Sequence, residues 1–279
     1  MMIHPEEINK EETPAAATFD PTDLKYRVSD EFPPDKESTW PYPPEKSGWF
    51  MAHNCLRGMM EQFQDCLTSV RGRKANEYPH YLQVWQVDCL QELFAFQYDM
   101  VKEHHTTEDN ILAPEFLKRF KYPDKLVDDH EGIIKLLDKV NGIVKNLKPG
   151  ADSVASMDEL IVEFEKYSKA IRPHFEEEES VGLLLLRAYF EPKELAKIMK
   201  KGHSQTKPQP EAIGCFIYFN GTDNMRKFIK QEGIPIFVWY LVFLPGYKKY
   251  CRNILPKVNA LKNGAEPVPE KRGLFSCFF

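Results

Sequence analysis

The sequence has 279 residues and a formal net charge of −5. Its 42% hydrophobic and 28% charged residues are typical of a globular protein with a buried core, and no apolar run reaches the roughly 18 to 20 residues of a membrane-spanning helix. With 37 basic and 42 acidic side chains there is no basic surplus to neutralise phosphates, which argues against nucleic acid as a partner.

The six cysteines are spread along the chain, and no two of them have C-x-x-C spacing. Most lie among apolar neighbours, which favours reduced thiols over a disulfide framework. The first residues have neither the basic nor the apolar region of a secretory signal. We therefore predict a cytoplasmic protein.

Residues 1–45 carry eight prolines and no sustained hydrophobic period. Because proline breaks helices, we predict an extended N-terminal arm here. The sequence leaves open whether this arm is disordered or lies against the rest of the protein through Trp40 and Tyr42.

Helical periodicity begins near residue 46 and continues to residue 190. Four segments carry apolar residues at alternating spacings of three and four, the pattern of a helix with one buried face. They span residues 50–70, 87–111, 130–147 and 157–185, with breaks at 71–79, 113–123 and 149–150. The pattern predicts an all-α protein built on an up-down-up-down four-helix bundle.

Shorter amphipathic segments separated by glycine and proline follow residue 190. They predict additional C-terminal helices at residues 192–201, 210–219, 222–231 and 236–261, with Pro256 kinking or ending the last one. We expect residues 191–279 to pack on the bundle as a helical extension. Its aromatic residues, Phe216, Tyr218, Phe219, Phe237, Trp239, Tyr240 and Phe243, could instead form an apolar pocket or a surface for a protein partner.

Polar residues interrupt all four apolar stripes: His53, His104 with Glu108, His130, and His174 with Glu178. Within each His-Glu pair the spacing of four places both side chains on one helix face. Counting residues from the predicted turns brings all six to one level of the bundle, within about 3 to 10 Å. Two buried carboxylates without compensation would be very costly, so this layer predicts bound cations rather than a polar structural network.

The combined motifs resemble the hemerythrin-like (HHE cation-binding) family over residues 48–190. They are Met51–Arg57, His104–Pro114, Asp129–Glu131 and His174–Glu179. The resemblance implies a non-haem di-iron site with an oxo or hydroxo bridge. It implies that Glu108 and Glu178 bridge the irons, with His53, His104, His130 and His174 as terminal ligands.

The sequence departs from oxygen-carrying hemerythrins at Ile134, where they have a second histidine four residues after the third-helix ligand. Fewer imidazoles leave more coordination positions open, which argues against a reversible oxygen carrier. His105 lies about 100° around the helix from His104, so we expect it behind the ligands or in solvent, with direct ligation as the less favoured alternative. Glu131, Glu177 and Glu179 are expected on outer faces, with the alternative that Glu131 orients a ligand histidine.

We therefore expect a protein that binds iron, dioxygen or both, for sensing or iron handling. The alternative is an oxygen-activating di-iron oxidase or peroxidase-like enzyme, which needs a channel to the metal layer. Whether the chain is an enzyme stays open at this point. Iron storage, zinc binding and a metal-free helical scaffold rank behind these two readings.

Overall fold

The computed structural model describes residues 19–77, 79–203 and 209–267. Within these ranges the chain is helical and contains no β-strand, only the isolated bridges Arg27–Phe120 and Leu82–Gly150. The predicted all-α class is therefore confirmed for the described residues. None of the helices in those ranges is long and apolar enough to cross a membrane.

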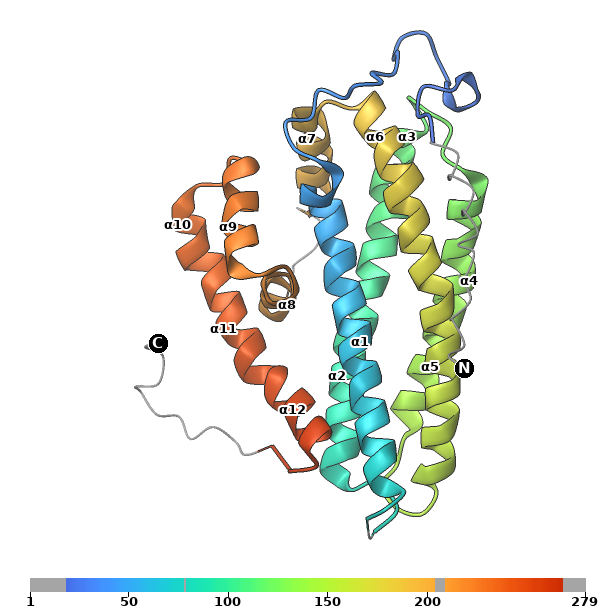
Figure 1. The fold of residues 1–279 in the computed structure, drawn as a ribbon, viewed down its shortest axis with the longest axis vertical. Coiled ribbons are helices and arrows are strands. Elements are labelled where there is room, and N and C mark those ends of the chain that lie inside the picture. The colour runs from blue at the N-terminus through green and yellow to red at the C-terminus, as the bar shows by residue number, and fades with distance from the viewer. Residues whose placement is uncertain (1–18, 78, 204–208, 268–279) are drawn as a thin grey trace, which may run out of the picture.

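Four long helices lie side by side along the long axis of the molecule (Figure 1). They are α1 (Gly48–Lys74), α2 (Val84–Thr107), α4 (Asp124–Asn146) and α5 (Ser153–Glu177). Helix α1 packs against α2 and α5, and α4 packs against the same two helices, so the four share one core. Predicted inward positions on each helix, Leu67, Leu90, Leu137 and Leu160, are completely buried in that core.

Helices α2 and α5 both continue into a wider π-helical turn at the end nearest the polar layer. Helix α2 runs into η3 (Glu108–Leu112) and then α3 (Ala113–Phe116). Helix α5 runs into η4 (Glu178–Gly182) and then α6 (Leu183–Tyr189). A π turn holds one extra residue, so the buried stripe shifts by one position.

Two details of the sequence prediction are wrong because of these turns. Leu112 is buried where the stripe predicted Ile111. The helix also does not break at Ala113 but continues to Phe116. Ala113 donates its N–H to Glu108 O across the π turn, and Pro114, which has no N–H to donate, follows directly.

The described part of the predicted N-terminal arm lies against one end of the long helices and includes η1 (Leu24–Tyr26) and η2 (Pro44–Lys46). Trp40 is buried, and its Nε1 donates to Phe190 O at 2.7 Å. Tyr42 donates its hydroxyl proton to Glu232 Oε1 at 3.3 Å. Trp40 and Tyr42 thus make the contacts that one of the two alternatives required. Residues 1–18 of the predicted arm lie outside the described residues.

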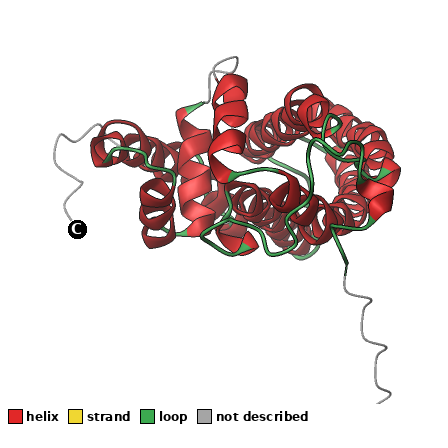
Figure 2. Ribbon diagram, turned by 90° about the horizontal axis from the view of Figure 1, so that it is seen from above, coloured by secondary structure: helices red, strands yellow, loops and turns green. Residues whose placement is uncertain are grey.

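The C-terminal segments lie to one side of the four long helices (Figures 1 and 2), in contact with α1, α2 and η3. They are α7 (Pro192–His203), α8 (Pro210–Asn220), α9 (Thr222–Gln231), α10 (Ile236–Val238), η5 (Trp239–Phe243), α11 (Leu244–Asn253) and α12 (Leu255–Asn263). Pro256 occupies the first turn of α12, so the predicted last helix is divided just before it. Residues 268–279 lie outside the described part of the chain.

Helices α8 and α11 approach each other closely through two glycines. A Cβ on Gly214 would lie 2.3 Å from Gly246 O, so a larger residue would force the helices apart. The aromatic residues of the extension divide between interior and surface: Trp239 is buried, whereas Phe237 and Tyr240 are each 59% exposed.

Candidate metal centre

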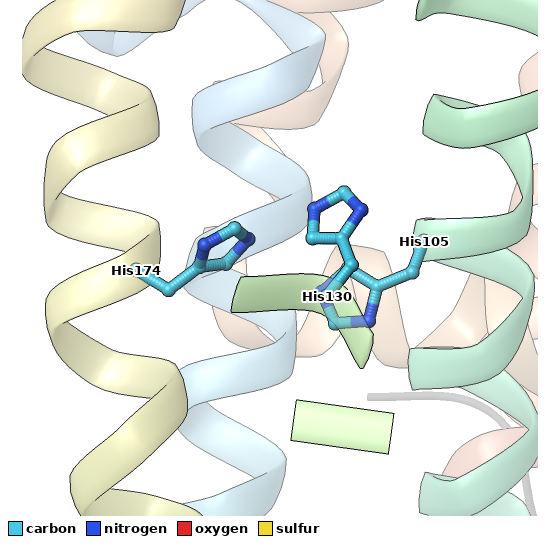
Figure 3. Close-up of side chains that lie close together, drawn as sticks. All are labelled: His105, His130 and His174. Atoms are coloured by element: carbon cyan, nitrogen blue, oxygen red, sulfur yellow. The ribbon is translucent and has the colours of Figure 1, made fainter. Parts of the chain in front are cut away.

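Seven potential metal-binding side chains converge at one level of the four long helices. His53, His104, Glu108 and Glu178 form one group, in which one potential ligand atom from each lies within 4.8 Å of the others. His105, His130 and His174 form a second group with the same spacing. Figure 3 shows the three imidazoles of this second group, which come from α2, α4 and α5. The structure thus brings together all six predicted residues and adds His105.

The two glutamates connect the two histidine groups. Glu178 Oε2 lies 3.2 Å from His53 Nε2, while its Oε1 lies 3.3 Å from His174 Nε2. Glu108 Oε1 lies 3.2 Å from His104 Nε2, and its Oε2 lies 3.8 Å from His130 Nε2. Each carboxylate therefore turns one oxygen toward each group.

His105 was expected behind the ligands or in solvent, with direct ligation as the alternative; the structure excludes the solvent position and places the ring beside His130 and His174. Its side chain is 1% exposed, and its ring centroid lies 4.6 Å from that of His130. Helix α2 buries a sector here that is wide enough for two adjacent residues, since His104 also faces the layer. The spacing of four between Gln97, Val101 and His105 is a sequence signal for this, because it places the three residues on one helix face. In the structure all three are buried.

Acidic residues next to the two glutamates orient two of the histidines. His53 Nδ1 donates to Glu179 Oε1 at 2.9 Å, and His130 Nδ1 donates to Asp109 Oδ1 at 2.7 Å. Each bond fixes its imidazole so that the Nε2 atom points toward the centre. Glu179 was expected on an outer face, but Arg57 also holds it, at 2.6 Å and 2.9 Å.

The other two acidic residues behave differently. Glu131 does not orient a histidine, because it pairs with Lys135 on the surface at 2.5 Å. Glu177 pairs with Lys125 and is partly exposed, as expected for an outer-face residue.

A family model for the hemerythrin HHE cation-binding domain matches residues 48–184. The chain therefore carries a hemerythrin-like domain. The match begins at Gly48, the first residue of α1, and ends within α6, so all seven converging side chains lie inside the matched region. Comparisons of the chain with curated proteins and with solved structures gave no match.

Buried polar atoms without partners mark the centre of the hemerythrin-like domain. Within the described residues, both carboxylate oxygens of Glu108 and Glu178 make no hydrogen bond. The same holds for Nε2 of all five histidines and for Nδ1 of His105 and His174. Leaving so many buried polar atoms unpaired would be very costly, and cations would satisfy them. A donor set of imidazole nitrogens and carboxylate oxygens suits transition metals such as iron.

The two glutamates of the hemerythrin-like domain have opposite protonation preferences without a cation. Burial, followed by the nearby Glu178 and Asp109 charges, raises the pKa of Glu108 well above its usual value. Burial also raises the pKa of Glu178, but the imidazoles of His130, His174 and His53, whose Nε2 atoms lie 3.2 to 3.6 Å from its oxygens, outweigh burial and leave this pKa well below normal. Without a cation, the centre therefore favours the protonated form of Glu108 over that of Glu178, and a bound cation would displace such a proton.

The histidines divide in a similar way. Burial and the neighbouring His130 lower the pKa of His105 to about 3, and burial with His53 lowers the pKa of His104 well below normal. These imidazoles are neutral at pH 7, the form that binds metal. Burial lowers the pKa of His130 too, but Asp109 and Glu178 raise it to about 9.

Proposed function

We propose that the hemerythrin-like domain holds a non-haem di-iron centre within an up-down-up-down four-helix bundle of α1, α2, α4 and α5. The observation that carries this proposal is the layer of unpaired imidazole and carboxylate atoms, in which each carboxylate faces both histidine groups. Such a pair of carboxylates suits two cations a short distance apart, with an oxo or hydroxo group as a further bridge.

In this proposal Glu108 and Glu178 bridge, His53 and His104 bind one iron, and the group of His105, His130 and His174 binds the other. His105 supplies a fifth imidazole, in place of the histidine that oxygen-carrying hemerythrins have at the position of Ile134. The objection to an oxygen carrier, which rested on a missing imidazole, loses its basis. When bound, the iron pair would supply dioxygen binding and one-electron chemistry.

The physiological role we propose is iron or dioxygen binding for sensing or iron handling. Because binding to the folded state alone stabilises it, occupancy of the centre would change how readily the domain unfolds. A partner that responds to this change needs a surface, and the exposed side chains of Ile236, Phe237, Tyr240 and Leu241 offer one. The cytoplasm remains the proposed location, in keeping with the unpaired cysteines of the described residues.

The second candidate function is an oxygen-activating oxidase or peroxidase-like enzyme. A cavity of about 670 Å³ favours it, because Glu108 and His130 form part of the wall.

The proposed division of the chain is an arm over residues 1–45, the bundle over 46–190 and a helical extension over 191–279.

Metal analysis of the purified protein tests the di-iron proposal. We expect about two irons per chain after reconstitution and a rise in melting temperature on iron loading. Glu178→Gln should lose most of the iron, whereas Glu177→Gln, the matched change one residue away on the partly exposed side, should keep it. A wild-type protein that takes up no iron and melts at the same temperature with iron added would refute the proposal.

A further inference from the structure

Exposed apolar side chains gather on α10 and η5, at the outer edge of the C-terminal helices. Residues 236–244 are nine consecutive apolar residues. Five of them are 42 to 70% exposed and are called the apolar face here: Ile236, Phe237, Tyr240, Leu241 and Val242. No other seven-residue stretch of the described chain holds more than two exposed large apolar side chains. Figure 1 shows α10 and α11 on the side of the molecule away from the long helices, with α8 between α11 and α1.

Basic side chains extend this face along the same helical run, which continues from α10 through η5 into α11. Trp239 and Tyr250 are buried and mark the inward side of the run. Lys248, Lys249 and Arg252 are exposed, so they lie on the outward side together with the apolar face. Neither lysine forms an ion pair with any described residue. Both ammonium groups are therefore available to negative charges on another surface.

Helix α9 adds a further cation next to the apolar face. The guanidinium carbon of Arg226 lies 5.1 Å from the ring centroid of Trp239, the residue before Tyr240. Residues 222–253 contain six basic and only two acidic side chains, although the whole chain has a net charge of −5. The rest of the chain is therefore acidic, and an anionic surface would attract this region while it repels the remainder.

An apolar face bordered by cations has the chemistry of a helix that lies in a membrane–water interface. Apolar side chains of such a helix enter the boundary between headgroups and acyl chains, while lysine and arginine contact anionic lipids. Tyr240 suits the same position, because its ring is apolar and its hydroxyl is polar. A protein partner could cover the apolar face, but the unpaired lysines beside it favour a surface that carries many negative charges.

We propose that the apolar face and the basic residues beside it bind the anionic lipid surface of a membrane, with the run from α10 to α11 lying in the plane of the interface. This inference goes beyond the iron proposal and does not depend on it. It agrees with the proposed cytoplasmic location, because the cytoplasmic leaflet of membranes carries anionic lipids.

Sedimentation of the full-length protein with lipid vesicles tests the proposal. One set of vesicles is phosphatidylcholine alone, and the other contains about one-third phosphatidylserine. We expect binding to the mixed vesicles, at least about tenfold weaker binding to phosphatidylcholine alone, and a loss of the difference when salt rises from about 0.1 to about 0.5 M.

The basic residues are tested by a pair of double variants with equal loss of charge. Lys248→Gln with Lys249→Gln should weaken binding to the mixed vesicles about 25-fold, roughly fivefold for each cation near the surface. Lys145→Gln with Lys148→Gln removes two exposed lysines at the end of α4 and should leave binding almost unchanged.

The apolar face is tested by a second matched pair. Phe237→Gln with Leu241→Gln should weaken binding about tenfold, because less apolar surface enters the interface. Leu24→Gln with Val84→Gln, at sites that are 74% and 63% exposed, should bind like the wild type. Circular dichroism of each variant verifies that the helices are retained.

Three results would overturn the proposal. In the first, the wild type stays in the supernatant with the mixed vesicles. In the second, both double variants of the face bind as tightly as the wild type, and deletion of residues 268–279 abolishes binding, which would assign binding to that segment. In the third, protein that binds no vesicles forms a dimer that Phe237→Gln with Leu241→Gln dissociates, which would assign the apolar face to a second copy of this chain.

Discussion

His53 Nδ1 donates a hydrogen bond of 2.9 Å to Glu179 Oε1, one residue after the proposed bridging Glu178. Asp109, one residue after Glu108, accepts the equivalent bond from His130. Glu108 and Glu178 are each the first residue of a π-helical turn. Each turn therefore presents one carboxylate to the centre and the next to the far side of a histidine ring, which fixes the orientation of that ring.

Glu179→Gln should weaken iron binding about 10- to 100-fold while the helical content stays the same, because the amide is a poorer acceptor for His53 Nδ1. Competition with a chelator of known affinity measures the change. Glu177→Gln is the control, since Glu177 contacts Lys125 and none of the histidines. An unchanged iron affinity in Glu179→Gln would show that the His53–Glu179 bond has no part in metal binding.

His105→Ala should reduce the bound iron from about two per chain to about one, because His105 is one of three imidazoles in the second group. The double variant His105→Ala with Ile134→His should regain iron, since position 134 follows His130 by one helical turn. Metal analysis by mass spectrometry gives the stoichiometry. Retention of two irons by His105→Ala would exclude it as a ligand.

Glu108→Gln should lose iron and yet stabilise the metal-free protein at neutral pH. Burial and Glu178 raise the pKa of Glu108 in the folded state, so the unfolded chain releases this proton at lower pH. The folded state is therefore penalised as pH rises above about 4.5, and glutamine removes the penalty, roughly 1 to 3 kcal/mol.

Urea unfolding of the chelated proteins at several pH values measures this difference. The stability gained by Glu108→Gln should be small near pH 4.5 and grow toward pH 8. A gain that is constant with pH would contradict the assigned protonation of Glu108.

Gly214→Ala should destabilise the protein by about 1 to 3 kcal/mol, because its Cβ would meet the backbone of Gly246 at 2.3 Å. Gly142→Ala lies inside α4 with no atom within 4 Å of the added Cβ, and should stabilise by about 0.5 to 1 kcal/mol. Thermal unfolding compares the two. Equal melting temperatures would mean that α8 and α11 do not pack as closely as described.

Much of the fold could be predicted because helical periodicity reports burial directly. The stripe positions Leu67, Leu137 and Leu160 are all buried, and α9 begins and ends at the predicted residues Thr222 and Gln231. Proline and glycine marked most helix ends, because proline has a fixed φ and no N–H to donate, and glycine adopts backbone conformations that other residues avoid.

The details that escaped prediction involve the two π turns and the width of the buried sector on α2. A regular spacing of 3.6 residues per turn cannot register the extra residue at Glu108 or Glu178. Direct ligation by His105 was the less favoured interpretation because an ideal helix with one narrow stripe excludes adjacent inward residues. The role of Glu179 depends on the orientation of a ring on α1, a tertiary relationship that helical spacing alone does not contain.

Electron paramagnetic resonance of the iron-loaded, air-oxidised protein, with iron content measured on the same sample, tests the central claim most directly. Two ferric ions bridged by Glu108 and Glu178 should couple magnetically, so that about two irons per chain give almost no signal. A strong signal of isolated high-spin ferric iron, at one iron per chain or at two, would contradict the bridged centre.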